Sequence, residues 1–187
     1  MPDSSSVKVA IVYHSLEGQT HKIAEYIAAH AQAAGVNVTV DQPDTAPGTL
    51  AGYGGVIIAG SVHVGHHHKD LAQYVRDHRD ELEAIPNALV SVSLTAVKHD
   101  PLHHEQAMGV VSGFVSETGW HPDQVALIGG ALAYTQYGFI KRQVLKHIAK
   151  KEGATTDTST DHSLTDWEAV DAFTDDFLAH VRAPIAP

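Results

Sequence analysis

The stretch of sequence that decides the fold is VKVAIVYHSLEGQT, from Val7 to Thr20. Its first half, Val7 to Tyr13, is a run of β-branched and apolar residues that predicts a buried strand. Its second half, Ser15 to Thr20, has a hydroxyl at each end and Gly18 between them, and apolar residues at helical spacing follow at once. A strand, a glycine turn and a helix in this order predict the start of a βαβ unit.

The remainder of the chain repeats this alternation of strand and helix, which predicts an α/β fold with helices on both faces of a parallel sheet. We expect residues 1–187 to form one domain behind a short disordered N-terminus at residues 1–6, because this length lies within the usual span of a domain. The predicted elements are strands at Val7 to Tyr13, Val36 to Val40, Gly55 to Gly60, Ala88 to Leu94 and Val125 to Ile128, and helices at Thr20 to Ala34, around Leu71, Val75 and Leu82, near His104 to Thr118, and from Asp166 to Val181 with Thr165 as cap.

The amino-acid composition of the chain excludes several classes of chemistry and of binding partner. The chain contains no cysteine, which excludes disulfides, thiolate catalysis and iron–sulfur ligation and suits a reducing compartment. The net charge of -10 argues against nucleic acid as a partner. The first residues lack a secretory signal, and no apolar run reaches the length of a membrane span. We therefore expect a cytoplasmic protein whose redox work, if any, depends on a bound cofactor.

The turn from Ser15 to Thr20 has the form of a phosphate cradle. Unpaired amides at a helix start and the positive end of the helix dipole converge on one point, and Ser15 and Thr20 add hydroxyl donors. The lysine of a triphosphate loop and the G-x-G-x-x-G dinucleotide pattern are both absent, which favours a monophosphate. The alternative is an ordinary capped turn in which these hydroxyls only satisfy the helix end.

The segment Ser15-x-Glu17-Gly18-Gln19-Thr20 resembles the FMN phosphate loop of flavodoxins, with Glu17 where those proteins usually have a hydroxyl residue. An acidic residue before Gly-Gln-Thr is typical of the bacterial flavodoxin-type, quinone-dependent protoporphyrinogen IX dehydrogenases. Further segments are similar to that family: Ala59 to His68, Val90 to Leu94, Gly129 to Tyr134, Trp120 to Asp123, and Thr165 to Glu168.

This resemblance implies a flavodoxin-like sheet of order 2-1-3-4-5 and FMN as cofactor. It also implies that the loops after the third and fourth strands hold the flavin ring, with His63, Val64 and Val97 as candidate walls. The cofactor-binding residues implied are Ser15, Leu16, Glu17, Gly18, Gln19, Thr20, Ser61, Val62, His63, Val64, Gly65, Ser93, Leu94, Thr95, Ala96, Val97 and Lys98.

Candidates for proton transfer are His66, His68 and Tyr134, since imidazole titrates in the useful range and Tyr134 follows the fifth strand. The alternative to proton transfer is a structural role, which would be solvation or helix entry for the run His66 to His68 and packing for Tyr134. Consecutive histidines point in different directions, so we expect no metal site in this run.

Residues 139–151, FIKRQVLKHIAKK, predict a short basic amphipathic helix. In the protoporphyrinogen dehydrogenase family the corresponding insert is associated with membrane contact and quinone access, whereas the bland interpretation is a solvated helix. The leading hypothesis is an FMN-dependent dehydrogenase that acts on a small-molecule redox substrate, a porphyrinogen or a quinone, with peripheral membrane contact through residues 139–151. The alternatives are a one-electron carrier and an FMN-binding protein without turnover. Nothing in the residues sets the oligomeric state.

Overall fold

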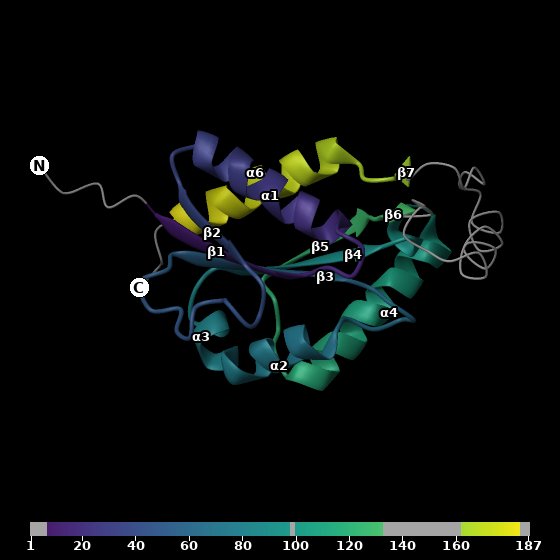
Figure 1. Cartoon of the computed structure of the whole chain (residues 1–187), viewed down its shortest axis with the longest axis horizontal. Coiled ribbons are helices and arrows are strands. Elements are labelled where there is room, and N and C mark those ends of the chain that lie inside the picture. The colour runs from purple at the N-terminus through teal and green to yellow at the C-terminus, as the bar shows by residue number, and fades with distance from the viewer. Residues whose placement is uncertain (1–6, 98–99, 133–161, 184–187) are drawn as a thin grey trace, which may run out of the picture.

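The computed structural model describes residues 7–97, 100–132 and 162–183, and it contains a five-stranded sheet of order β2-β1-β3-β4-β5 (Figure 1). Every pairing in this sheet is parallel, which confirms the predicted strand order. The predicted disordered N-terminus lies outside the described residues. The strands are β1 (Lys8–His14), β2 (Asn37–Asp41), β3 (Gly55–Ser61), β4 (Asn87–Ser93) and β5 (Gln124–Gly129).

Helices cover both faces of the sheet, as Figure 1 shows, with α1 and α6 on one side and α2, α3 and α4 on the other. A short antiparallel pair, β6 (Ala131–Leu132) with β7 (His162–Ser163), lies beyond the sheet. The helices are α1 (Gln19–Ala33), α2 (Lys69–Asp77), α3 (Arg79–Glu83), the single 3-10 turn η1 (Thr95–Val97), α4 (Pro101–Thr118) and α6 (Trp167–Arg182).

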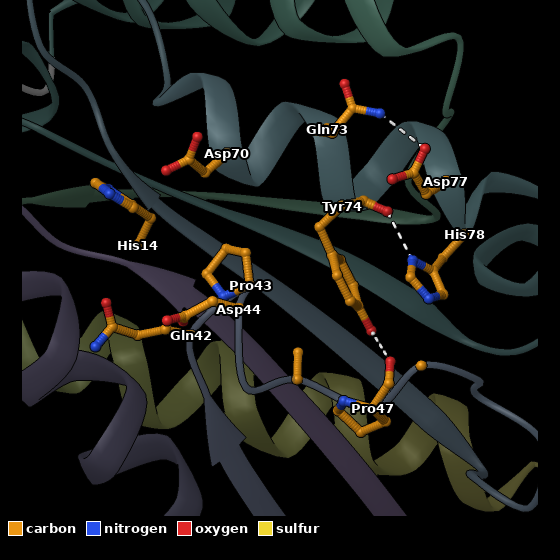
Figure 2. A pocket seen from close by; sticks show the side chains of 12 residues that line it. His14, Gln42, Pro43, Asp44, Pro47, Asp70, Gln73, Tyr74, Asp77 and His78 are labelled. Atoms are coloured by element: carbon orange, nitrogen blue, oxygen red, sulfur yellow. Dashed lines mark hydrogen bonds between the residues drawn. The ribbon is translucent and has the colours of Figure 1, made fainter.

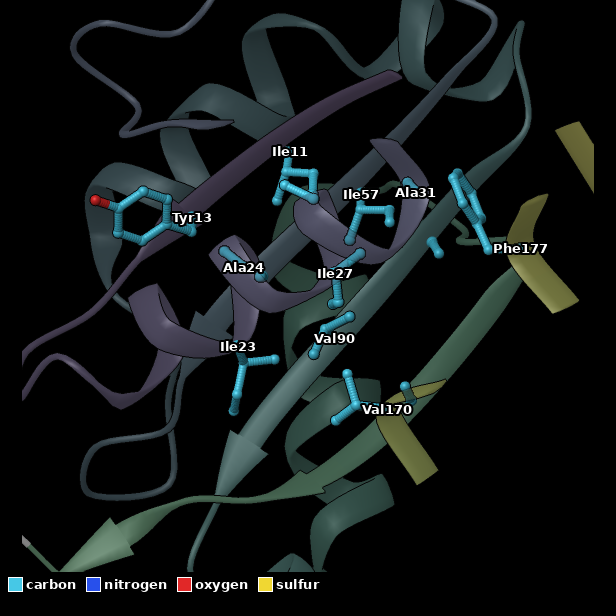
Figure 3. Close-up of a cluster of buried hydrophobic side chains, with 14 of the residues drawn as sticks. Ile11, Tyr13, Ile23, Ala24, Ile27, Ala31, Ile57, Val90, Val170 and Phe177 are labelled. Carbon is cyan, nitrogen blue, oxygen red and sulfur yellow. The ribbon is translucent and has the colours of Figure 1, made fainter. Parts of the chain in front are cut away.

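Two apolar clusters, one on each face, hold the helices to the sheet. Alternate residues of β1 serve the two clusters, with Ile11 facing α1 and α6 and Val12 facing α2 and α4. Figure 3 shows the first cluster, in which Ile23 and Ile27 of α1 and Phe177 of α6 meet the sheet. Since the central strands are buried on both faces, their sequences are nearly continuous apolar runs.

Three sequence predictions about helix ends are wrong. The second predicted helix is two helices, broken at His78, whose ring bonds the Tyr74 carbonyl at 2.9 Å. The third predicted helix, expected near His104 to Thr118, is α4 and already begins at Pro101, because the Asp100 carboxylate accepts the amide of His103 at 3.1 Å and caps it.

The third correction concerns the last helix. Asp166 caps α6 by accepting the Ala169 amide at 3.1 Å, whereas Thr165 was predicted as the cap. The Thr165 hydroxyl instead donates to the Gly129 carbonyl at 2.8 Å. Among the described residues, no helix combines the length and apolar character that crossing a bilayer requires.

Candidate functional site

Three loops that the sequence singled out leave the sheet from neighbouring strands at its carboxyl end. His14, the last residue of β1, pairs with Gly60 of β3, and Ser61 of β3 pairs with Val92 of β4. The loops after β1, β3 and β4 therefore begin side by side, where the strand order reverses. This is the position at which doubly wound sheets bind ligands.

The first loop, residues 15–18, is a tight turn closed by its own side chain. The Ser15 hydroxyl accepts the Gly18 amide at 2.9 Å, and Gly18 has a φ of 86°, a left-handed conformation that suits glycine. Thr20 lies in the first turn of α1 and is 1% exposed, yet its Oγ1 atom has no hydrogen-bond partner within the described part of the chain. A buried hydroxyl without a partner is costly, and its place beside the amides of a helix start suits an anionic acceptor.

The second loop follows β3. The Val62 amide donates to the Val92 carbonyl at 2.8 Å, and His63 and His66 exchange two backbone hydrogen bonds that close a hairpin-like turn. Val64, at the tip, is 84% exposed with a φ of 50°, a strained conformation for a β-branched residue. Ser61 Oγ is buried, and none of the described residues forms a hydrogen bond with it. The loop thus presents an unsatisfied hydroxyl at its base and a strained aliphatic side chain at its tip.

The third loop follows β4 and is held by local hydrogen bonds. The Ser93 hydroxyl accepts the Ala96 amide at 3.1 Å, and the Leu94 carbonyl accepts the Val97 amide at 3.3 Å. The Ser93 carbonyl also accepts the Gly130 amide at 3.1 Å, which ties this loop to the end of β5. The predicted residues Leu94 to Val97 are all half-buried at this edge of the sheet.

A hydrogen-bond chain that sequence analysis missed joins the first loop to the far side of the site. Gln19 Nε2 donates to the Thr165 hydroxyl at 2.8 Å, and that hydroxyl donates to the Gly129 carbonyl, also at 2.8 Å. The start of α1, the entry to α6 and the end of β5 are thereby fixed to one another. The sequence predicts Thr165 only as a helix cap, and its three-dimensional placement is needed to reveal its place in this chain of hydrogen bonds.

The histidine run divides into three different environments, so the solvation predicted for the whole run is wrong for His67. His67 is 7% exposed, packs edge-on against Phe114 and lies 3.3 Å from the Ser91 hydroxyl. Burial lowers its pKa to about 4, against the smaller opposing effects of the Ser61 backbone and the Glu117 charge. His67 therefore supports the β3 loop from below as a neutral ring.

The other two members of the run stay near the surface. His66 is exposed, and its backbone pairs with His63. His68 is the N-cap of α2, where its Nδ1 accepts the Asp70 amide at 3.3 Å, so the helix-entry role is confirmed for this residue. The remaining candidates Lys98 and Tyr134, together with the basic stretch 139–151, lie outside the described residues.

Aliphatic side chains stand exposed around the same three loops. Leu16 of the first loop is 49% exposed, and Leu102, at the start of α4 after the third loop, is 59% exposed. Val64, in the loop after β3, is a third exposed aliphatic side chain near these loops. The arrangement combines a cradle for an anionic headgroup with loops suited to a planar, partly apolar group.

Comparison with known proteins gives a family match and relatives that align with 94% of this chain. The model of the flavodoxin domain family matches residues 10–159. The chain is 32% identical over 181 residues to protoporphyrinogen IX dehydrogenase (quinone) of Escherichia coli strain K12, covering 94% of this chain and 96% of the relative. It is 34% identical over 179 residues to the protein of the same name from Leishmania major, covering 94% and 77%.

Solved structures resemble this fold at low sequence identity. A short-chain flavodoxin associated with a non-canonical PDU bacterial microcompartment superposes with a TM-score of 0.54 and 11% identity, over 94% of this chain and 99% of the other. Oxidised flavodoxin 1 of Bacillus cereus superposes with a TM-score of 0.50 and 14% identity, over 92% and 98%. These likenesses concern the fold alone.

Proposed function

Because the chain belongs to the flavodoxin family, we propose that it is an FMN-dependent oxidoreductase, a dehydrogenase that takes electrons from a protoporphyrinogen-type substrate and passes them to a quinone. The observation that carries the proposal is the identity of 32% and 34% to two relatives of that name, which extends over 94% of the chain. The resemblance therefore includes all three loops at the carboxyl end of the sheet.

The first loop fits the phosphate of FMN. Its closed turn, the helix start at Gln19 and the unpartnered Thr20 hydroxyl supply donors for a dianion, and no lysine is needed for a single phosphate. The phosphate-binding residues proposed are Ser15, Leu16, Glu17, Gly18, Gln19 and Thr20. When bound, FMN supplies the redox chemistry by taking up electrons from an organic donor and releasing them to an acceptor.

The second and third loops are assigned to the flavin ring. Val64 and Val97 supply apolar surface, and the unpartnered Ser61 hydroxyl supplies a polar contact at the base of the loop. The ring-binding residues proposed are Ser61, Val62, His63, Val64, Gly65, Ser93, Leu94, Thr95, Ala96, Val97 and Lys98. Neither loop contains tyrosine, tryptophan or phenylalanine, so one ring face stays accessible to a substrate.

An apolar rim favours a substrate of porphyrinogen or quinone type. Leu16, Val64 and Leu102 are exposed around the loops, and burying such side chains against an apolar ring system contributes about 25 cal/mol for each square ångström covered. We place the protein in the cytoplasm as a single domain. Contact with the membrane surface through residues 139–151 would bring the site close to quinone.

The alternative is a one-electron carrier, which the net charge of -10 favours because an acidic surface can dock basic redox partners. An anaerobic experiment separates the two functions. FMN-loaded protein is mixed with protoporphyrinogen IX, and flavin absorbance is followed before and after a menaquinone analogue is added. If the protein is a dehydrogenase, its flavin absorbance falls with protoporphyrinogen IX and recovers in the same preparation when the menaquinone analogue is added. A flavin that stays oxidised with the porphyrinogen, yet exchanges electrons with a redox protein, would make the chain a carrier.

The cofactor assignment has its own test. Thr20→Val keeps the volume of the side chain and removes the hydroxyl, and we expect FMN affinity to fall roughly tenfold or more, because hydrogen bonds to charged groups contribute about 1.5–3 kcal/mol. Thr174→Val is the matched control, since Thr174 is equally buried in α6 and its hydroxyl donates within the helix. Equal FMN dissociation constants for the two variants, measured by flavin fluorescence, would remove Thr20 from the phosphate site.

A further inference from the structure

A cluster of two histidines and an aspartate lies just below the first loop and is not used by the flavin site. His14 ends β1, His68 caps α2, and Asp70 is in the first turn of that helix. The His14 and His68 rings stack with centroids 3.8 Å apart and planes 3° from parallel. One nitrogen from each ring and one Asp70 oxygen all lie within 4.8 Å of one another.

The His14 ring offers a nitrogen atom for coordination. Its Nδ1 atom is buried and has no hydrogen-bond partner among the described residues. An imidazole nitrogen that accepts no hydrogen bond can coordinate an ion through its lone pair.

The cluster opens into a cavity whose charge suits a cation. His14 and Asp70 line a cavity of about 460 Å³, shown in Figure 2, to which Asp44 and Asp77 add two further carboxylates. None of the described residues that line this cavity is a lysine or an arginine. A cation held by His14 and Asp70 would thus face unbalanced negative charge, with room for water to complete its coordination.

We propose that His14, His68 and Asp70 bind a divalent transition-metal ion of the zinc class through two imidazole nitrogens and one carboxylate oxygen. Two histidines and one carboxylate with an open fourth position form a ligand set that Zn²⁺ accepts. The stacked rings turn about their Cβ–Cγ bonds to converge on the ion, a rotation with broad, shallow preferences in histidine. Coordination then replaces the ring stack.

The ion would join two parts of the flavin site without being part of its chemistry. His14 directly precedes Ser15 of the first loop, and His68 directly follows the β3 loop and its supporting His67. A metal bridge between His14 and His68 therefore fixes the separation of the two loops. The inference stands on these side chains and does not depend on which substrate the protein reduces or oxidises.

The test is calorimetric titration of the FMN-loaded full chain with ZnCl₂ after treatment with a chelator. We expect wild-type protein to bind one equivalent more tightly than its surface histidines do. His14→Gln, His68→Gln and Asp70→Asn should each weaken that equivalent by roughly tenfold or more, since even the loss of a supporting residue costs 10- to 100-fold. His121→Gln is the control, because His121 is 77% exposed and far from this cluster in sequence.

Thermal unfolding with and without ZnCl₂ guards against misfolded variants. Zinc should raise the Tm of wild-type protein and of His121→Gln by similar amounts, and should raise the Tm of a folded Asp70→Asn variant clearly less. Asp70 is exposed, so its replacement is compatible with folding. If the three cluster variants and His121→Gln give the same zinc isotherm and the same Tm shift, zinc binds only adventitious histidines and the proposal is overturned.

Discussion

The two ends of the sheet treat their polar groups in opposite ways. At the amino end, the Asn87 side chain accepts from Trp120 Nε1 at 3.1 Å and from the Asp123 amide at 3.2 Å, and it donates to the Asp123 carboxylate at 2.9 Å. At the carboxyl end, Thr20 Oγ1 and Ser61 Oγ are buried without hydrogen-bond partners in residues 7–97, 100–132 and 162–183. Buried polar groups are normally satisfied, so the carboxyl end is the part of the molecule built to receive something else.

One polar group at the amino end departs from this pattern. Gln124 Oε1, at the amino end of β5, is also buried without a partner among the described residues. The amino end otherwise forms a closed network that includes the Asp123 carboxylate and the Ile85 carbonyl. We therefore expect substitutions at the amino end to change stability and leave FMN binding intact. Those at the carboxyl end should affect both, or binding alone.

The largest effect on stability should come from a substitution at the amino end of the sheet, where the polar groups are hydrogen-bonded. Asn87→Ala leaves Trp120 Nε1 and the Asp123 amide without acceptors, and each buried orphan costs about 1–3 kcal/mol, so we expect the free energy of unfolding to fall by about 4 kcal/mol. Urea denaturation measures this loss. The control is Gln73→Ala, whose amide bonds Asp77 on the exposed face of α2 and should cost less than about 0.5 kcal/mol.

FMN affinity of the folded Asn87→Ala protein shows whether the two ends of the sheet act independently. It should match that of the wild type within a factor of about two, because Asn87 lies at the opposite end of β4 from the flavin loops. A large drop in FMN affinity would show that the two ends are coupled, and the contrast drawn between them would fail.

The second effect is a pH dependence that originates below the β3 loop. His67 has a folded pKa of about 4, against 6.5 for an unperturbed histidine, so the unfolded chain binds the additional proton between these values. Stability from this residue is complete above pH 6.5 and is lost as the pH falls toward 4, by about 3 kcal/mol in all. Urea unfolding at pH 7 and pH 5 should show a smaller loss for His67→Leu than for wild-type protein.

Other histidines titrate in the same range, so the difference between variants is the quantity to use. His30 has the opposite sign, since hydrogen bonds to Asp175 and Asp171 raise its pKa and favour the folded state at lower pH. His121→Gln serves as the exposed control. An identical pH dependence in His67→Leu and wild-type protein would contradict the buried, neutral state of His67.

The sequence predicts the fold and the loops of the site, but it does not predict which distant side chains meet. Strand order, element order and the three loops follow from apolar runs, glycine turns and the resemblance of Ser15 to Thr20 to a phosphate loop. The links between distant residues do not, because spacing carries no information on which side chains meet. Gln19 with Thr165, and His14 with His68, come together only through the fold.

The histidine run illustrates the same limit within three residues. A local pattern predicts only that neighbouring side chains diverge, and they do: His67 turns inward beneath Gly60, while His68 caps a helix. Which of the three is buried depends on the space left by a glycine in a neighbouring strand. Helix ends were misjudged for a related reason, since competing caps such as Thr165 and Asp166 are distinguished by tertiary partners.

The third effect tests the space beside Gly60 that the His67 ring occupies. A Cβ atom on Gly60 would lie 2.6 Å from His67 Nδ1 and 2.7 Å from Leu71 Cδ2, both well inside contact distance. Gly60→Ala should therefore lower the free energy of unfolding by about 2 kcal/mol, as overpacked cores do. Gly113→Ala is the matched control, because it lies in the exposed face of α4 with open space around it and should stabilise by about 0.5–1 kcal/mol. Equal effects for the two variants would show that His67 yields easily.

The smallest effect concerns the strained tip of the β3 loop. Val64 has a φ of 50°, which costs a β-branched residue about 1–2 kcal/mol, while glycine adopts it freely but loses more chain entropy on folding. The balance predicts that Val64→Gly raises the free energy of unfolding by up to about 1 kcal/mol, a gain measurable by urea denaturation. Val125→Gly, on the edge strand β5, should instead lower it by about 1 kcal/mol. If Val64→Gly also weakens FMN binding, the strained Val64 side chain contacts the flavin ring. If the variant is more stable and binds FMN with unchanged affinity, Val64 contacts only the substrate.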